Sequence, residues 1–173
     1  MDELENEIKQ GKRLLFAELR ALFKRPDAEA LFKAYLSSSE GYYFGSKEDE
    51  MLLISQPNAA TLLRVYSPWN SLIPEVQLAM IKKKNAKELL SAYQETYVLC
   101  EEAQIAMLRS KNASALLEVF MQKFKLDFGA EQELVDKLLG FPKAKAKALL
   151  AQYRQKYELS PKWREVALKR GLL

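Results

Sequence analysis

The chain has 173 residues, of which 49% are hydrophobic and 29% charged, which is too apolar for a disordered protein and long enough for one domain with a sizeable core. It has no histidine and one cysteine, which excludes an intrachain disulfide, a zinc site of the usual Cys/His type and Ser-His or Cys-His nucleophile pairs. The formal net charge of +4 permits an anionic partner without requiring one.

The N-terminal part of the chain predicts a degenerate helical hairpin followed by a loop. The hairpin ends near residue 35, and the Ser- and Gly-rich stretch 37–46 is the clearest loop in the sequence. Its aromatic residues Tyr42, Tyr43 and Phe44 stand between glycines. We interpret these three rings either as an exposed anchor for a protein partner or as a cover that folds back over the end of the first hairpin.

Three segments that begin at Lys47, Pro74 and Glu101 align without a gap, at an interval of 27 residues. They share the pattern Asn-Ala-x-x-Leu-Leu-x-x-aromatic. An interval of roughly 20–50 residues is typical of proteins built from stacked units. The aligned positions are Asn58, Asn85 and Asn112; Leu62, Leu89 and Leu116; Leu63, Leu90 and Leu117; and Tyr66, Tyr93 and Phe120.

Each copy predicts two helices that meet at the recurring asparagine. In the second helix the apolar residues follow the spacing i, i+1, i+4 and i+8, which forms one stripe that only a neighbouring copy can bury. Asparagine is a preferred N-cap residue, so Asn58, Asn85 and Asn112 are expected to accept hydrogen bonds from the second helices, with Asp27 in the same role earlier. Glu88 adds an arrangement like a capping box.

The predicted fold is therefore all-α, a right-handed α-solenoid of two-helix repeats with a period of about 27 residues and a C-terminal capping helix. Trp163 is expected to cover the last core layer. The layout resembles the broad class of α-helical hairpin repeats that includes tetratricopeptide and HEAT-type proteins, although the tetratricopeptide residue pattern is absent and no functional residue carries over. Residues 1–173 are expected to form a single domain, with a degenerate copy ending near 35, the loop 37–46, regular copies 47–72, 73–99 and 100–126, a lengthened copy 127–159 and a cap 160–173.

The predicted function is a non-enzymatic, cytoplasmic module or scaffold that binds a protein or peptide. The residues present offer no activated catalytic group, no metal site and no cofactor-binding loop, and no apolar run approaches the ~20 residues that span a bilayer. Besides the loop aromatics, the candidate contacts are solvent-facing positions of the second helices, namely Arg64, Ser91, Gln94, Glu95, Glu118 and Gln122.

Three alternatives remain open at this stage. The cations Lys82, Lys83, Lys84, Arg109 and Lys111 form a basic edge that could bind nucleic acid, although cations are also favoured at helix C-termini. The recurring aromatic residue could stack bases, although its spacing favours the core. The open ends of the array could mediate self-association. At one helix start, where the helix dipole can lower a thiol pKa, we interpret Cys100 as structural.

Overall fold

The computed structural model describes residues 3–38, 44–137 and 143–173. These residues form helices joined by turns and loops and contain no strand, which confirms the all-α class. No helix in the described part of the chain is long and apolar enough to cross a membrane.

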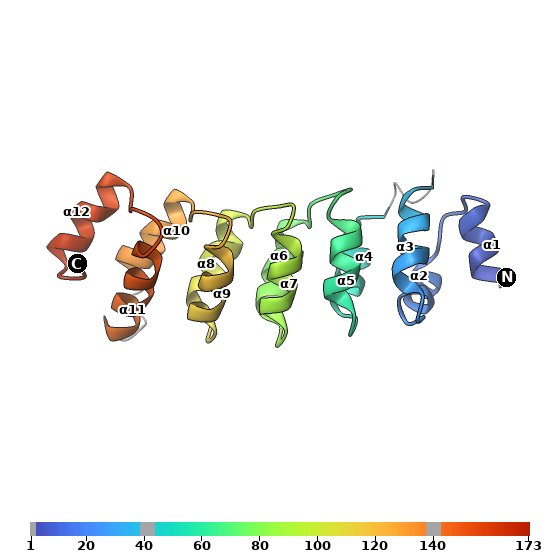
Figure 1. Cartoon of the computed structure of the whole chain (residues 1–173), viewed down its shortest axis with the longest axis horizontal. Coiled ribbons are helices and arrows are strands. Elements are labelled where there is room, and N and C mark those ends of the chain that lie inside the picture. Colours follow the sequence, from blue (N-terminus) through green and yellow to red (C-terminus); the bar gives the residue numbers. More distant parts are fainter. Residues whose placement is uncertain (1–2, 39–43, 138–142) are drawn as a thin grey trace.

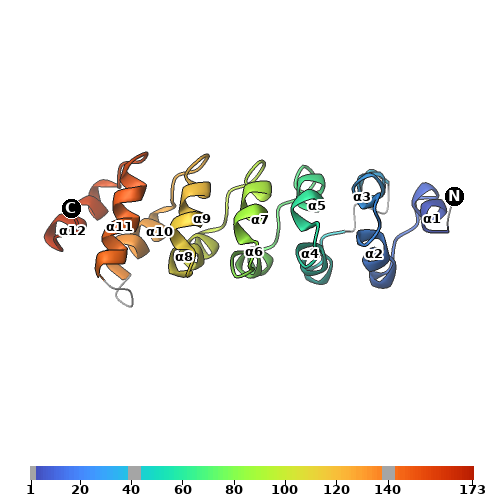
Figure 2. The same ribbon diagram turned by 60° about the horizontal axis from the view of Figure 1, so that its bottom comes forward.

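The helices lie in two layers that run in chain order from one end of an elongated molecule to the other (Figures 1 and 2). Within each layer every helix packs against the next one, and each first helix packs against its own second helix. The first layer holds α2 (Phe16–Phe23), α4 (Lys47–Ile54), α6 (Pro74–Ile81), α8 (Glu101–Arg109) and α10 (Phe128–Gln132), which continues into the π-helix η2 (Glu133–Lys137). The second layer holds α3 (Ala28–Leu36), α5 (Ala59–Tyr66), α7 (Ala86–Tyr93), α9 (Ala113–Phe120) and α11 (Lys143–Arg154).

One further helix lies at each end of the row. Helix α1 (Glu3–Lys9) packs against α3, and α12 (Pro161–Lys169) packs against η2. Trp163 of α12 is buried, and its indole N–H donates to the carbonyl oxygen of Phe128 at 3.1 Å. Its burial at this end agrees with the covering role expected from the sequence.

The core lies between the two layers and is built from the recurring apolar positions. Leu62, Leu89 and Leu116 occupy corresponding interior places in α5, α7 and α9, and each is at most 1% exposed. The recurring aromatic position is also buried, at Tyr35, Tyr66, Tyr93, Phe120 and Tyr153. These rings therefore belong to the core and are not available to stack nucleic-acid bases.

The turn between the two helices of a hairpin corrects the expected role of asparagine. Asn58, Asn85 and Asn112 do stand at the N-cap positions, yet none of their side chains accepts a capping hydrogen bond. A backbone carbonyl of the turn accepts instead, because the N–H of Ala59 donates to the carbonyl oxygen of Gln56 at 3.2 Å. The same bond recurs in three further turns of the described residues, from Ala28 to Arg25, from Ala86 to Lys83 and from Ala113 to Ser110.

Asp27 and Glu88 also lack the capping roles expected from the sequence. Asp27 instead pairs with Arg25, whose Nε lies 2.8 Å from the carboxylate, and this hydrogen bond lowers the pKa of Asp27. The backbone N–H of Glu88 donates to the carbonyl oxygen of Asn85, so no reciprocal side-chain box forms. In these turns a backbone carbonyl thus satisfies the first N–H of the second helix without help from a side chain.

A buried polar side chain occurs at the same place in four first helices, at intervals of 27 residues. Glu50, Gln77, Gln104 and Glu131 are at most 4% exposed. Each side chain accepts a hydrogen bond from the backbone N–H of the residue that precedes the next first helix or, for Glu131, helix α12. The donors are Ile73 (2.8 Å), Cys100 (2.7 Å), Asp127 (2.8 Å) and Ser160 (3.0 Å).

Three of these side chains also bond to the tyrosine of their own hairpin. The hydroxyl groups of Tyr66 and Tyr153 donate to Glu50 and Glu131 at 2.7 Å and 3.0 Å. The amide of Gln77 donates to the hydroxyl of Tyr93 at 3.2 Å. Together with the bonds from the backbone N–H groups, they join each hairpin to the next one, because an unpaired buried polar group would cost about 1–3 kcal/mol. Burial and the neighbouring carboxylate Glu50 raise the pKa of Tyr66 far above its usual range.

Replacing Glu50 by glutamine is expected to stabilise the protein at neutral pH. Burial raises the pKa of Glu50, so its charged form is disfavoured in the folded state. The contribution of Glu50 to stability is therefore complete below its unfolded pKa and is lost as the pH rises through its folded pKa. A glutamine keeps both hydrogen bonds in the manner of Gln77 and does not titrate.

The measurement is the free energy of unfolding in urea as a function of pH. The advantage of Glu50→Gln over the wild type should shrink as the pH falls towards about 4.3, the usual pKa of a glutamate. Glu48→Gln, on the exposed face of the same helix, is the control and should not reproduce this trend. A stability difference that does not change with pH would contradict the prediction.

Candidate binding grooves

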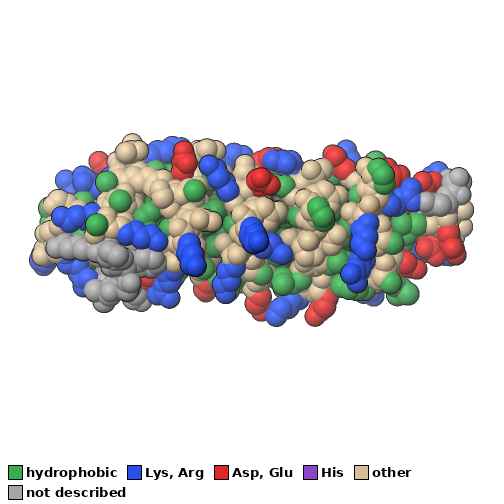
Figure 3. Space-filling model, turned by 90° about the horizontal axis from the view of Figure 1, so that it is seen from below, with side chains coloured by type: hydrophobic (Ala, Val, Ile, Leu, Met, Phe, Trp, Pro, Cys, Tyr) green, Lys and Arg blue, Asp and Glu red, His purple; other side chains and the backbone are tan. Residues whose placement is uncertain are grey.

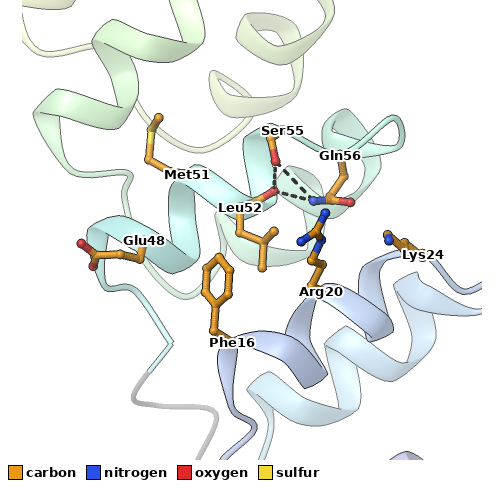
Figure 4. A pocket seen from close by; sticks show the side chains of 8 residues that line it. All are labelled: Phe16, Arg20, Lys24, Glu48, Met51, Leu52, Ser55 and Gln56. Atoms are coloured by element: carbon orange, nitrogen blue, oxygen red, sulfur yellow. Dashed lines mark hydrogen bonds between the residues drawn. The ribbon is translucent and has the colours of Figure 1, made fainter.

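A groove with an apolar floor lies between the first two helices of the first layer (Figure 4). We call it the α2/α4 groove, and its volume is about 560 Å³. Helices α2 and α4 run in the same direction along its two sides (Figure 4). Its lining residues are Phe16, Arg20 and Lys24 from α2 and its C-cap, and Glu48, Met51, Leu52, Ser55 and Gln56 from α4 and the turn that follows.

Opposite charges stand at the two ends of the α2/α4 groove. Glu48 lies at the end where the two helices begin, and Arg20 and Lys24 lie towards the end where they finish (Figure 4). No ion pair within the described residues involves these three side chains. The charges are therefore available to groups outside the chain.

Large apolar side chains near this groove are exposed to solvent. Leu15 is 67% exposed, Phe16 is 50% exposed and Met51 is 38% exposed. A second hollow of about 420 Å³ adjoins the groove beyond Phe16 and is lined by Leu15 and by the buried ring of Phe44. Exposed apolar side chains grouped around a groove are typical of surfaces that bind other molecules.

An equivalent groove lies between α6 and α8, with a volume of about 410 Å³. Its α8 residues are those that stand 54 residues, or two units of 27, after the α4 residues of the first groove. They are Glu102, Ile105, Ala106, Arg109 and Ser110, and they face Leu78, Ile81 and Lys82. An acidic residue again stands at the start of the helices and basic residues at their end.

No protein-family model, curated protein or solved structure matches this chain. The chemistry of the grooves must therefore indicate what they can bind. Within the part of the chain that the structure describes, no three His, Cys, Asp or Glu side chains are grouped so that they could hold a metal ion. The lining combines an apolar floor with separated charges, which suits an amphipathic peptide segment.

The second-helix positions predicted as contacts do not form such a groove. Arg64 and Glu95 are exposed, but they pair with each other at 2.8 Å. Glu118 is exposed and lies 3.8 Å from Lys87. Side chains of this face therefore largely satisfy one another, while Ser91 is half-buried and Gln122 is exposed.

Gln94 corrects the prediction that it faces solvent. Its side chain is 2% exposed, and its amide nitrogen donates to the carbonyl oxygen of Val119 at 2.7 Å. Gln94 follows α7 directly, where its side chain reaches the neighbouring helix α9. It therefore links two hairpins and is not available to a partner.

The loop aromatics divide into two groups. Tyr42 and Tyr43 lie outside the described residues, whereas Phe44 is 3% exposed. The ring of Phe44 lies 5.0 Å from that of Phe32 and 5.2 Å from that of Tyr66. Phe44 thus fills the space between the first two hairpins and is a core residue, not an exposed anchor.

The basic edge predicted from the sequence lies along the turns between first and second helices, on the side shown in Figure 3. Lys82, Lys84 and Lys111 are exposed and Lys83 is half-exposed. No ion pair among the described residues involves any of these four lysines. Arg109 differs, because it makes two hydrogen bonds of 2.8 Å and 3.0 Å to the buried carboxylate of Glu133, which raises the pKa of Arg109.

The second layer has a hollow that the sequence did not predict. Trp69 follows α5, is 49% exposed and lines a hollow of about 490 Å³ with Arg64, Val65 and two residues of α3. The only sequence signal was a tryptophan inside the Pro- and Ser-containing connection 67–71. Of the charged side chains in this lining, Arg64 is already paired with Glu95.

Cys100 is a free, half-buried thiol directly before α8. Burial raises the pKa of its thiol, so any lowering by the helix dipole is outweighed. We expect iodoacetamide to alkylate Cys100 at pH 8 at least several times more slowly in the native protein than in the protein unfolded by urea. Mass spectrometry of quenched samples measures both rates, and equal rates would show that the thiol is not protected.

Proposed function

We propose that the chain is a right-handed α-solenoid of two-helix units, with a period of about 27 residues, that binds a protein or peptide segment without catalysing a reaction. The α2/α4 groove is the proposed binding site. The cytoplasm is the proposed location, where a lone cysteine stays reduced. The observation that carries the proposal is the pair of grooves built from corresponding residues of the first layer.

The first layer supports this function better than the second one. In the α2/α4 groove the side chains of Phe16 and Met51 remain exposed. Burying them against a partner removes apolar surface from water, which favours binding. Arg20 and Lys24 are free of ion pairs with described residues and add charge specificity. Together these groups supply the apolar centre and the polar rim of a typical interface.

A random-peptide display library tests the proposal. Peptides that are enriched on the wild-type protein should lose binding to Met51→Glu, which places a charge on the floor of the groove. Val98→Glu is the matched control, since Val98 is similarly exposed, at 44%, but does not line the groove. Circular dichroism should show that both variants remain folded, because both side chains reach solvent.

Two results would refute the groove as the binding site. One is a library that yields no peptide binding above background on the wild-type protein. The other is a set of enriched peptides that bind Met51→Glu as tightly as the wild type. If the peptides lost binding to Val98→Glu alone, the binding site would have to lie outside the first layer.

A second candidate function is nucleic-acid binding along the basic edge. Lys82, Lys83, Lys84 and Lys111 support it, because their charges are not neutralised within the described residues. A mixed-sequence single-stranded oligonucleotide is the probe, and its affinity should fall steeply with salt. Replacing Lys82, Lys83 and Lys84 by glutamine should reduce the slope of log affinity against log salt by about 2. Absence of salt-dependent binding would remove this candidate.

A further inference from the structure

We propose that the α2/α4 groove accepts an amphipathic helix of a partner protein, which runs antiparallel to α2 and α4 and carries acidic residues in its N-terminal half. The inference rests on the proposed function and names the class of partner for the same groove. Three features of the described residues carry it: the length of the groove, the placement of its charges and the direction of its helices.

The groove has the dimensions of a short helical contact. Phe16 and Lys24, which mark its two ends on α2, are eight residues apart, or roughly 12 Å along the helix axis. That length matches about two turns of a partner helix. Such a helix presents side chains at i, i+4 and i+7 on one face, and these can rest on Phe16, Met51 and Leu52.

The charges of the groove require a partner with the opposite arrangement. Arg20 and Lys24 favour carboxylates at the end of the groove where α2 finishes, and Glu48 favours a cation at the other end. In the adjoining hollow beyond Phe16, Arg13 and Asp49 carry opposite charges and leave this polarity unchanged. Two further polar side chains at the end where α4 finishes are held internally, because Ser55 and Gln56 both donate to the carbonyl oxygen of Leu52 at 2.7 Å and 2.8 Å (Figure 4).

The direction of the helices favours the antiparallel orientation. Helices α2 and α4 both finish near Lys24, where their backbone carbonyls give the surface a partial negative charge (Figure 4). The N-terminus of an antiparallel partner helix brings a partial positive charge to this end. Helices also favour acidic residues in their first turn, so a partner helix with an ordinary distribution of charge places its carboxylates opposite Arg20 and Lys24.

The α6/α8 groove has the same polarity but offers less to such a helix. Leu78 and Ile105 on its floor are half-buried, whereas Phe16 is half-exposed. Arg109 at its basic end is already bound to Glu133. The α2/α4 groove is therefore the one expected to hold the partner.

The test uses two synthetic helical peptides of about four turns with identical composition and an apolar i, i+4 stripe. One carries acidic residues in its N-terminal half and basic residues in its C-terminal half, and the other has these halves exchanged. A side-chain staple on the face opposite the stripe gives both peptides the same helix content, which circular dichroism verifies. Fluorescence anisotropy measures their binding to the full chain, to the double variant Arg20→Glu/Lys24→Glu and to Lys83→Glu/Lys84→Glu.

The wild type should bind the peptide with the acidic N-terminal half at least about tenfold more tightly, which corresponds to about 1.4 kcal/mol. Arg20→Glu/Lys24→Glu should reverse this preference. Lys83→Glu/Lys84→Glu changes the net charge by the same amount outside the groove and should keep the wild-type preference.

The failure of this inference can be separated from the failure of the proposed function. If both peptides bind the wild type equally and both lose binding to Met51→Glu, the groove binds peptides and the charged antiparallel helix is refuted. If neither peptide binds while library peptides bind in a manner sensitive to Met51→Glu, the helical partner class is refuted. If no peptide of either kind binds, the proposed function fails as well.

Discussion

Replacing Leu89 by alanine is expected to lower the free energy of unfolding by about 2–5 kcal/mol. Leu89 is fully buried in α7, at the centre of the row of hairpins, where α5 and α9 pack on either side. Removing its side chain forfeits apolar burial and leaves a cavity that close-packed neighbours fill only in part. A loss of this size is a large share of the ~5–15 kcal/mol that typically stabilises a domain.

Urea denaturation followed by circular dichroism measures this loss. Lys87→Ala, in the same helix but exposed, is the control and should cost less than about 1 kcal/mol, because its ion pair with Glu118 lies at the surface. Leu62→Ala and Leu116→Ala should each cost about as much as Leu89→Ala, since all three leucines occupy corresponding buried places. If the cost of Leu89→Ala were as small as that of Lys87→Ala, the conclusion that Leu89 belongs to a core shared by the two layers would be wrong.

The central position of Leu89 also predicts a change in cooperativity. In a row of hairpins each unit gains its stability mainly from its neighbours. A defect in α7 therefore weakens the coupling between the N-terminal and C-terminal parts, and the urea transition should broaden. The same substitution at Leu62, nearer to one end of the row, should broaden the transition less.

The sequence predicted the core of this protein well because the signal for it is local. The Leu-Leu-aromatic spacing alone decides which face of a second helix is apolar, and Leu62, Leu63 and Tyr66 are all buried as that spacing requires. The helical hairpins follow from the same reasoning, whereas the burial of Trp163 was expected because the open end of a stack of hairpins requires a cover.

The errors concern residues whose place depends on a neighbouring hairpin. Gln94 is polar and follows a helix, but it is buried because Val119 of the next hairpin offers a carbonyl oxygen. For Phe44 the sequence allowed either an exposed anchor or a cover over the first hairpin, and its burial against the rings of Phe32 and Tyr66 agrees with the cover. Such outcomes require the distance between hairpins, which the sequence pattern does not contain.

The sequence predicted a contact face on the second layer, whereas the grooves lie on the first layer. Variation at exposed second-helix positions suggested a contact face, but ion pairs such as Arg64–Glu95 occupy those side chains across hairpins. The groove depends instead on how far apart α2 and α4 lie, which no local pattern encodes. The glutamate or glutamine that recurs at intervals of 27 residues, at Glu50, Gln77, Gln104 and Glu131, is a sequence signal for the links between hairpins and not for the groove.

Gln104 is the member of this polar series whose replacement should cost most. Its side-chain oxygen accepts from the backbone N–H of Asp127 at 2.8 Å. Its amide nitrogen donates to the carbonyl oxygen of Leu99 at 2.8 Å and to the carboxylate of Asp127 at 2.7 Å. Phe120 stands where the other hairpins have a tyrosine, so Asp127 supplies the polar contact that a hydroxyl group supplies elsewhere.

Gln104→Met should therefore lower the free energy of unfolding by about 1–3 kcal/mol, because a side chain of similar length leaves the N–H of Asp127 without its partner. Gln104→Glu should be worse at neutral pH, since the introduced carboxylate faces the carbonyl of Leu99 and the carboxylate of Asp127. Protonating that carboxylate at low pH restores a donor, so its folded pKa is raised and stability returns as the pH falls.

Urea denaturation at neutral pH and at about pH 5 distinguishes these effects, with Gln122→Met on the exposed surface as the control. The loss of unfolding free energy caused by Gln104→Glu, relative to the wild type, should shrink at the lower pH. The loss caused by Gln104→Met should be the same at both pH values. If Gln104→Glu were no worse than Gln104→Met at neutral pH, then the hydrogen-bond donor of Gln104 would not be what fixes its hairpin to the next one. That result would leave the side-chain oxygen of Gln104, which accepts from the backbone N–H of Asp127, as the polar link between the two hairpins.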